Sequence, residues 1–559
     1  MRASPRIPRR HASTRIPSPR DVGRGGFGCG RALLAFFCVW SCTFGVALAD
    51  RDDAADRLER VESLLREAQI EEAEQLLGPI AAAHPDAPRV AMSLAMVAFH
   101  RGDYERALAA MDRAIAGAPA DSVPEDWRTL RGLVAGSREV TRGFVEERSA
   151  DGRFVVSFAP GIDRVLVPYA LTGLAAAHDA MHEVLAFRPP GPVRLEILPD
   201  TSALARVSTL TVAEIERTGT IALCKWDRLM VTSPRALVRG YPWLDTIAHE
   251  YVHLVVTRMT RDRAPVWLQE GLAKMLERRW RARLSGRASD GAEQIEPSVH
   301  ALLLEAARAR TLLPFERLHP SIARLPSQRD AALAFAQVYS FVRYLHGERG
   351  DAGLRAALAD VRDGADAREA VADVMSTSFG ALHQRWVAAL LALPTPPRER
   401  PTYLGMRFRH GDGRVDESRD VGVTGARRFV RIGDLLWERR RARAAAVEYG
   451  RAHALAPRDP IVASRFAIAA LESGDPASAA RALGPMAVEQ PEHAPTRAVL
   501  GAALARSGDR TGALPHLVEA IRLNPFDPMP HCELAELASS PADSARERDA
   551  CRLLSSPGR

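Results

Sequence analysis

The sequence predicts an α+β domain between two all-α arrays of helical repeats. Pro457, Pro491 and Pro525 recur every 34 residues, and Pro85 and Pro119 keep the same interval near the N-terminus. Between these regions, short apolar runs typical of strands alternate with helical patterns. A period of this length indicates stacked helical units, and the mixed elements between them indicate a separate α+β domain.

Residues 1–49 form the first element, which we predict to be a secretory signal peptide. They contain eight arginines, no lysine and one acidic residue, Asp21. An apolar run from Ala32 to Ala49 follows and ends on Ala-Leu-Ala, a small-residue pattern typical of signal-peptide cleavage. The run is also close to the length of a membrane span, so an uncleaved anchor is the alternative. We expect a periplasmic or secreted protein.

Outside this leader the charges balance, because its eight arginines and one aspartate account for the whole formal net charge of +7. Because the remaining residues carry no net positive charge, they are not expected to attract nucleic acid or an anionic membrane surface. We therefore expect no nucleic acid partner and no membrane contact beyond the possible N-terminal anchor. Cys532 and Cys551 lie on neighbouring helical stretches and could form a disulfide, whereas Cys224 is expected to be a buried thiol.

Each repeat is expected to consist of two amphipathic helices. Ala445, Ala479 and Ala513 share the 34-residue interval, and a large residue follows each of them by four positions. A small residue lets two helices cross closely, and the proline ends the second helix. The pattern resembles the tetratricopeptide repeat and predicts one array within residues 50–148 and another, closed by capping helices, within 426–559. The resemblance implies that both arrays bind partner proteins.

The α+β domain is predicted over residues 149–396, with a surface loop over 281–298 and a linker over 397–425. Its expected strands are Arg153–Phe158, Val193–Leu198, Thr220–Cys224 and Leu229–Thr232, and its expected helices are 167–187, 242–258 and 265–280.

The helix over 242–258 contains a His-Glu-x-x-His sequence formed by His249, Glu250 and His253. Residues four apart lie on the same helical face, so both imidazoles can bind one metal ion. Glu250 can reach a water on that metal without being a ligand itself. Zinc lowers the pKa of such a water, and the carboxylate accepts its proton during attack on a carbonyl. The alternative is a buried helix whose histidines are hydrogen-bonded to neighbours.

The next helix supplies a third ligand. Glu270 lies 17 residues after His253, and the intervening loop is short enough for this helix to fold back on the first. Three protein ligands leave a fourth zinc position for water. Gly271 and Ala273 are expected to permit the close approach of the two helices. Glu277, two turns further on the same face, is the alternative third ligand.

The sequences His-Glu-x-x-His at 249–253 and Trp-Leu-x-Glu-Gly-x-Ala at 267–273 resemble those of the gluzincin metallopeptidases, specifically the peptidase MA-like domains often joined to tetratricopeptide repeats. The resemblance implies a zincin-like fold and zinc-dependent hydrolysis of peptides or proteins. It also implies a substrate-binding edge strand before the metal helix, for which residues 220–232 are the candidate.

One position departs from the family pattern. Relatives commonly place a tyrosine about 65 residues after the glutamate ligand, where its hydroxyl can stabilise the oxyanion. Phe335 occupies that position here, and Tyr339, one turn later, is the residue that we predict to substitute for it. Packing within its helix is the alternative role of Tyr339. Loss of an oxyanion donor typically costs about 10²–10³ in rate.

Four further residues are weaker site candidates. His178 and His182 are also four apart, but without an acidic partner helix they indicate a helix surface. Asp245 could orient His249, although a favourable charge in the first helical turn explains it equally well. Lys274 is expected to be a surface or packing residue.

Two functions are compatible with these features. The first is a zinc peptidase whose repeats recruit substrates or partners. The second is a non-catalytic interaction scaffold that carries a degenerate, metal-binding peptidase-like domain. The intact set of two histidines and two glutamates favours the enzyme, whereas Phe335 favours the scaffold.

Overall fold

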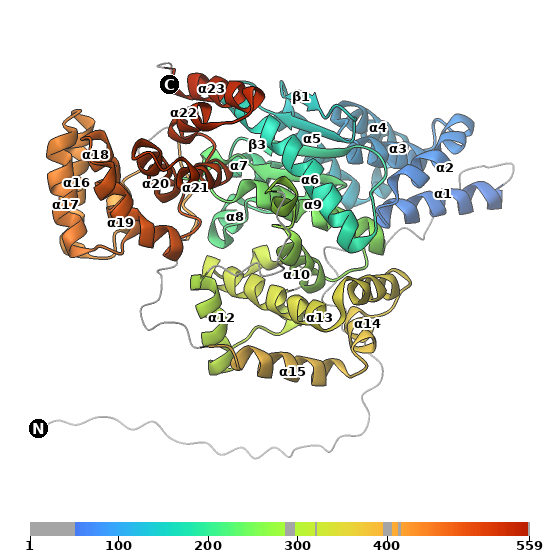
Figure 1. Ribbon diagram of the computed structural model, residues 1–559. Coiled ribbons are helices and arrows are strands. Elements are labelled where there is room, and N and C mark those ends of the chain that lie inside the picture. Colours follow the sequence, from blue (N-terminus) through green and yellow to red (C-terminus); the bar gives the residue numbers. More distant parts are fainter. Residues whose placement is uncertain (1–50, 286–296, 319–320, 395–404, 412–414, 557–559) are drawn as a thin grey trace, which may run out of the picture. The chain divides into compact units, whose positions relative to one another are not determined.

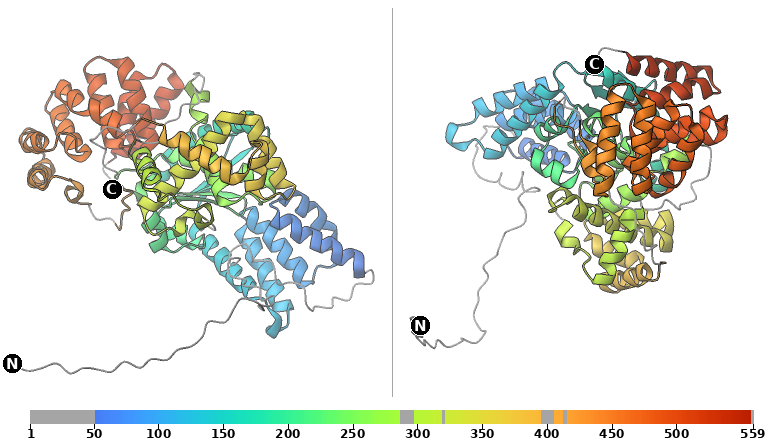
Figure 2. Two further views of the ribbon diagram at one scale, coloured as in Figure 1. Left: turned by 90° about the horizontal axis from the view of Figure 1, so that it is seen from below. Right: turned by 90° about the vertical axis from the view of Figure 1, so that its left-hand side faces the viewer.

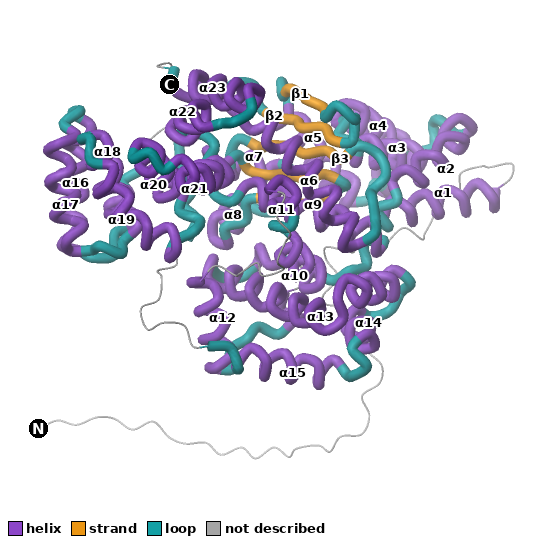
Figure 3. The backbone as a smooth tube through the Cα atoms, viewed as in Figure 1, coloured by secondary structure: helices purple, strands orange, loops and turns teal. Residues whose placement is uncertain are grey.

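Helices make up most of the structure, and a small mixed sheet lies among them (Figures 1 and 3). This computed structural model describes residues 51–285, 297–318, 321–394, 405–411 and 415–556. The predicted leader, 1–49, lies outside the described residues. Within the described ranges, no helix is both long enough and apolar enough to cross a membrane.

Five helices precede the main part of the sheet, and the first four pack as two helix pairs. Ala73 and Ala107, 34 residues apart, are fully buried, as the repeat pattern requires. Asp103 caps the fourth helix by accepting a hydrogen bond from the backbone N–H of Arg106. The five helices are α1 (Arg51–Arg66), α2 (Ile70–Ala83), α3 (Pro88–His100), α4 (Tyr104–Gly117) and α5 (Glu125–Thr141).

The sheet has five strands in the order β1-β2-β3-β5-β4. The three central strands run parallel to one another, and each outer strand is antiparallel to its neighbour. Every residue of β2 and β5 is buried, in keeping with the apolar residues that make up most of each strand. The sequence did not predict β1. The strands are β1 (Val145–Arg148), β2 (Phe154–Phe158), β3 (Val193–Leu198), β4 (Ala222–Lys225) and β5 (Arg228–Thr232).

A tight hairpin joins β4 to β5 and leaves β4 at the edge of the sheet. Trp226 and Asp227 form its two-residue turn, with φ of 52° and 61°. Positive φ at both central positions matches the twist of a two-residue hairpin. The Asp227 carboxylate pairs with Arg258 at the end of α9, which holds the turn in place. The edge strand expected within 220–232 is therefore present.

Helix α9 lies between the sheet and the helices that follow it. It contacts β4 and β5 on one side and α6, α10 and α13 on others. Trp243, Tyr251 and Val255 are among its many buried residues, so the helix is buried on nearly every face. The remaining helices of this region are α6 (Val167–Leu185), α7 (Thr201–Arg206), α8 (Val212–Thr218), α9 (Trp243–Thr260), α10 (Val266–Leu276), α11 (Trp280–Ser285), α12 (Pro297–Ala309), α13 (Gln328–Arg362), α14 (Ala367–Val374) and α15 (Phe379–Leu391).

Eight helices follow as a second stack, in which each helix contacts the next (Figure 2). Ala445, Ala479 and Ala513 are fully buried at the helix contacts. These helices are α16 (Thr424–Glu438), α17 (Ala442–Leu455), α18 (Pro460–Glu472), α19 (Pro476–Glu489), α20 (Ala494–Arg506), α21 (Arg510–Leu523), α22 (Pro528–Leu537) and α23 (Pro541–Ser555).

Two connecting segments are more ordered than the sequence suggested. The expected loop over 281–298 begins with five helical residues of α11, and its residues 286–296 lie outside the described part. In the expected linker, Phe408 is buried and forms a β-bridge with Leu237. The proline, glycine and charged residues of this segment indicated correctly that it has little regular structure. They did not show that the apolar side chain of Phe408 anchors the segment by packing into the core.

Cys532 and Cys551 form a disulfide that links α22 to α23 across 19 residues. Closing a loop of this length is expected to stabilise the cap by about 3 kcal/mol, mainly by restricting the unfolded chain. We expect Cys532→Ser/Cys551→Ser to unfold its cap at a lower temperature, measured by thermal unfolding without reductant. Reductant should shift the wild type in the same way and leave the double variant unchanged. Identical unfolding of the two proteins without reductant would contradict the prediction.

Candidate metal centre

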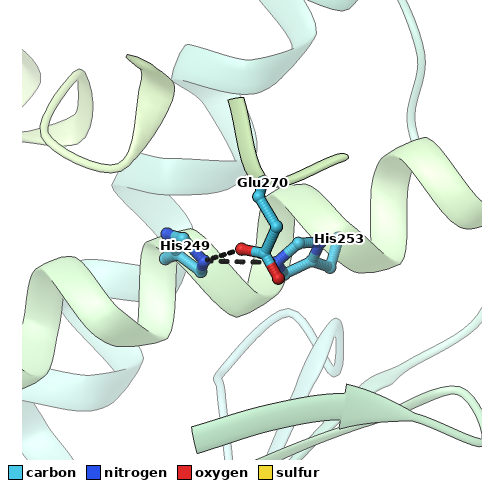
Figure 4. A group of neighbouring side chains, drawn as sticks. All are labelled: His249, His253 and Glu270. Atoms are coloured by element: carbon cyan, nitrogen blue, oxygen red, sulfur yellow. Dashed lines mark hydrogen bonds and ion pairs between the residues drawn. The ribbon is translucent and has the colours of Figure 1, made fainter. Parts of the chain in front are cut away.

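His249 and His253 lie one turn apart on α9, with ring centroids 4.9 Å apart (Figure 4). Only 12% of each side chain is exposed. The surrounding apolar residues of α9 are buried in the domain core, so the helix is fixed and both rings are held close together.

A tight turn brings the chain back from α9 to α10. Arg261 and Asp262 adopt left-handed conformations, with φ of 55° and 58°, and Pro265 immediately precedes α10. Glu270 thereby faces both histidines. Its Oε2 lies 3.2 Å from His249 Nε2 and 3.3 Å from His253 Nε2. The predicted fold-back of the second helix is what brings the three residues together.

Gly271 has a different role from the one predicted. A Cβ at this position would clash with the side chain of Val342 and the backbone carbonyl of Val338, both on α13. Adjacent helical residues point about 100° apart. Glu270 and Gly271 therefore face different neighbours, and the glycine permits close packing of α10 against α13 and not against α9.

The other nitrogen of each histidine has its own acceptor. His249 Nδ1 lies 3.1 Å from Glu277 Oε2, and His253 Nδ1 lies 3.2 Å from Gln269 Oε1. The amide nitrogen of Gln269 donates to the carbonyl of Ala264, which fixes the amide with its oxygen toward His253. With Nδ1 as the donor, each ring in its neutral, metal-binding form has its lone pair at Nε2.

Three acceptor atoms therefore converge on one point. The two Nε2 atoms lie 3.2 Å apart, and Glu270 Oε2 is similarly close to each. Lone pairs at this separation repel one another unless a proton or a metal ion lies between them. Two zinc ligands at about 2.05 Å with a tetrahedral angle lie about 3.3 Å apart, so these side chains fit a zinc ion. Among the described residues, His249, His253 and Glu270 form the group able to hold a metal ion.

The electrostatics of the centre also favour a cation. Burial lowers the pKa of His249, but hydrogen bonds to Glu270 and Glu277 outweigh burial and raise that pKa to about 10. Burial likewise opposes ionisation of Glu270, yet the two histidines hold the pKa of its carboxyl well below the usual range. Negative potential that attracts a proton so strongly also attracts a metal ion, which competes with that proton.

Glu250 lies beside this group without belonging to it. It is almost fully buried, and burial raises the pKa of its carboxyl, whereas the charges of His253 and His249 lower it. The backbone of Cys224 on the edge strand β4 also interacts with this carboxylate. Glu250 therefore sits between the converging ligands and the strand expected to receive substrate.

Phe335 lies against the centre, at the position where the family resemblance places a tyrosine. Its ring centroid is 6.2 Å from that of His249, in an edge-to-face arrangement. Tyr339 is buried one turn later on α13 and lines the same cavity as Phe335. Tyr241, which the sequence did not single out, also lines this cavity, and its hydroxyl donates to the carbonyl of Thr232. The role predicted for Tyr339 stays a prediction.

The remaining sequence candidates lie outside the three-residue group. The interpretation of His178 as part of a helix surface was wrong, because it is buried and its Nδ1 lies 2.7 Å from the Tyr251 hydroxyl. Asp245 is in the first turn of α9 as expected, but it is buried and accepts hydrogen bonds from Trp280 and Arg281. Lys274 is partly exposed and pairs with Glu277 at 2.7 Å.

Glu277 and Gln269 were not predicted as partners of the histidines. Glu277 was predicted only as an alternative metal ligand. Its spacing from Glu270 places both glutamates on one face of their helix, but it does not show which histidine nitrogen each glutamate contacts. Gln269 carries no signal in the sequence. The structure places Glu270 at the metal-facing side of His249 and Glu277 at the opposite side of the same ring.

Removing the charge of Glu277 is expected to weaken metal binding without abolishing it. Partners of this kind orient the ligand and increase its basicity, and their loss typically costs about 10–100-fold in metal affinity. We expect Glu277→Gln to lose zinc to a competing chelator at a correspondingly lower chelator concentration. Glu369→Gln on α14, an exposed glutamate outside the three-residue group and the cavity lining, is the control. Equal zinc affinity of the two variants would contradict the prediction.

Comparison with known proteins supports both parts of the sequence interpretation. Residues 176–392 match a family model described as the Peptidase MA superfamily. Residues 58–122 and 464–528 match a model described as the tetratricopeptide repeat. No functionally curated protein matches the chain.

Two solved structures match at low sequence identity. Yeast LTA4 hydrolase in complex with bestatin is 12% identical, and the alignment covers 73% of this chain and 67% of that one, with a TM-score of 0.28. Native leukotriene A4 hydrolase from Saccharomyces cerevisiae is 13% identical over the same shares, also with a TM-score of 0.28. TM-scores this low carry no argument about the fold or the function.

Proposed function

We propose that this chain, which carries a Peptidase MA superfamily domain between tetratricopeptide repeats, is a zinc-dependent hydrolase of peptide bonds. The repeats indicate interactions with other proteins, and we assign them the recruitment of substrates or partners. The observation that carries the proposal is the convergence of His249, His253 and Glu270, three acceptor atoms 3.2–3.3 Å apart.

These three residues would hold the metal, and Glu250 would perform the proton transfers. A bound zinc ion would polarise the scissile carbonyl and lower the pKa of water toward neutrality. Glu250 would accept a proton from the attacking water and deliver it to the leaving amine, so that the C–N bond breaks as a neutral amine departs. Its burial suits both steps, because a raised carboxyl pKa makes Glu250 a stronger base and a competent acid.

Substrate would bind along β4. This strand is at the edge of the sheet, so its outer backbone groups can pair with an extended peptide. The interaction between Glu250 and the backbone of Cys224 supports this proposal, because it joins the proposed base to that strand. Tyr339 remains our proposed donor to the oxyanion, and the hydrophobic ring of Phe335 cannot take that role.

One observation favours the scaffold alternative. Phe335 lies against His249 and has no hydroxyl to stabilise an oxyanion. A domain that binds zinc but lacks this donor could support protein binding with little hydrolysis.

The test is an assay of the purified chain, residues 50–559, on a broad peptide library. We expect cleavage that stops when a chelator removes the metal and returns when zinc is added. A chain that holds zinc but cleaves no peptide, before and after reconstitution, would sink the peptidase proposal and favour the scaffold.

We further propose that the protein acts outside the cytoplasm. The leader predicted over residues 1–49 motivates this proposal, and the Cys532–Cys551 disulfide supports it, because disulfides persist mainly in oxidising compartments. N-terminal sequencing of the protein from its native cells tests the proposal. A mature N-terminus near Asp50 is expected, and full-length protein confined to the cytoplasm would overturn it.

A further inference from the structure

A cavity of about 290 Å³ lies next to the candidate metal centre. Glu277, which holds His249 Nδ1, and Phe335, whose ring packs against His249, both line it. The cavity is about twice the volume of an apolar site of about 150 Å³ that accepts benzene. It can therefore accommodate a large side chain directly beside the proposed reaction centre.

One wall of this cavity comes from the C-terminal repeat array. Residues 490–493, the turn between α19 and α20, line it together with the α13 residues Ala332, Phe335 and Tyr339. Pro491 is one of the prolines that define the 34-residue period. This turn between two repeat helices therefore also lines the cavity.

Polar contacts fix the array against α9 and the segments next to it. The indole nitrogen of Trp243 on α9 donates to the carbonyl of Ile521 on α21 at 3.1 Å, and Arg281 pairs with Glu519 at 3.0 Å. The backbone N–H of Tyr241 donates to the carbonyl of Leu523 at 2.8 Å. These contacts hold the repeat wall in a defined position relative to the proposed ligands.

The chemistry of the lining selects a neutral, apolar occupant. Aromatic and aliphatic residues supply most of the surface. Within the described part of the chain, every charged residue of the lining already has a partner of opposite charge: Arg239 with Glu417, Lys274 with Glu277, Arg278 with Glu492, and Arg407 with Asp420. A charged ligand group would have to break one of these pairs, whereas an apolar side chain gains from leaving water.

We propose that this cavity receives a large apolar side chain of the peptide next to the scissile bond, and that the repeat turn 490–493 selects for it. This inference rests on the proposed peptidase function and names its substrate class. It gives the C-terminal array a direct part in substrate selection, beyond remote recruitment.

Two substitutions, one in each of two segments that line the cavity, test this inference by filling it. Pro491→Phe fills it from the repeat turn, and Ala332→Phe fills it from α13. Pro457→Phe is the matched control, because Pro457 is the same repeat position one unit earlier and is exposed. Each zinc-loaded full chain is tested on peptides that differ only in having Phe, Leu or Ala beside the scissile bond. The same peptides are tested for equilibrium binding to these chains in a Glu250→Gln background.

We expect the wild type and Pro457→Phe to prefer Phe or Leu over Ala by about 10-fold or more, the effect typical of a fitted apolar pocket. Pro491→Phe and Ala332→Phe should lose that preference in cleavage and in binding while retaining zinc. An unchanged preference in both filled variants, or a wild type that cleaves peptides without any preference, would overturn the inference. Apolar preference in binding without cleavage by the wild type would support the cavity and refute the peptidase function.

Discussion

Changing both His249 and His253 to alanine is expected to remove the metal from the protein. Purified wild-type chain should contain about one zinc ion, and the double variant close to none, because a single glutamate cannot hold zinc in competition with water. Metal analysis by mass spectrometry measures this directly. The loss should be complete, since the two Nε2 atoms supply two of the three converging ligands.

The control for this experiment is His182→Ala on α6, a histidine of the second His-x-x-x-His pair that lies outside the three-residue group. It should retain zinc. Zinc bound equally by the wild type and the double variant would place the metal elsewhere. Absence of zinc from the wild type after reconstitution would refute the metal centre and leave the repeats as the functional part.

Replacing Glu250 with glutamine is expected to reduce peptide hydrolysis by about 10²–10⁴-fold, the usual contribution of a general acid–base group. Glutamine has nearly the same shape but cannot accept the proton of the attacking water. Zinc content should be unchanged, because Glu250 is not one of the three converging residues. The measurement is kcat/KM on a peptide that the wild type cleaves, with zinc determined on the same sample.

Glu369→Gln on α14 provides the control for this variant, since it removes an exposed carboxylate that is not part of the three-residue group or of the cavity lining. Its rate should stay within a few-fold of the wild type, as expected of a residue outside the proton transfer. An unaffected rate in Glu250→Gln would assign the base to another residue. Loss of zinc together with activity would assign Glu250 a structural role.

Much of the fold was predictable because its signals are periodic and local. The predicted class, a zincin-like α+β domain with all-α tetratricopeptide arrays, is confirmed by the two family matches and the observed elements. Strand Val193–Leu198 has the predicted bounds, because apolar residues recur at every second position between turn residues. Strand β1 was missed, since its four residues are mostly exposed and give no apolar alternation.

The errors share a different cause. His178 was assigned to the helix surface because nothing in the sequence of its own helix predicts its burial. It is buried because it contacts Tyr251 on α9. Gly271 was assigned to the contact with α9, although the helix that requires the glycine, α13, begins more than 50 residues later. Neither contact leaves a trace in the local sequence pattern.

By itself, the sequence determined the 34-residue repeats, the α+β domain between them, and the placement of His249 and His253 on one helical face. Helical periodicity fixes which residues share a face, and that information is local. The tertiary structure decided which carboxylate meets which nitrogen, Glu270 at Nε2 and Glu277 at Nδ1. It also decided that a repeat turn near residue 491 forms a wall beside the proposed metal centre. Both depend on packing between segments far apart in the chain, which periodicity cannot specify.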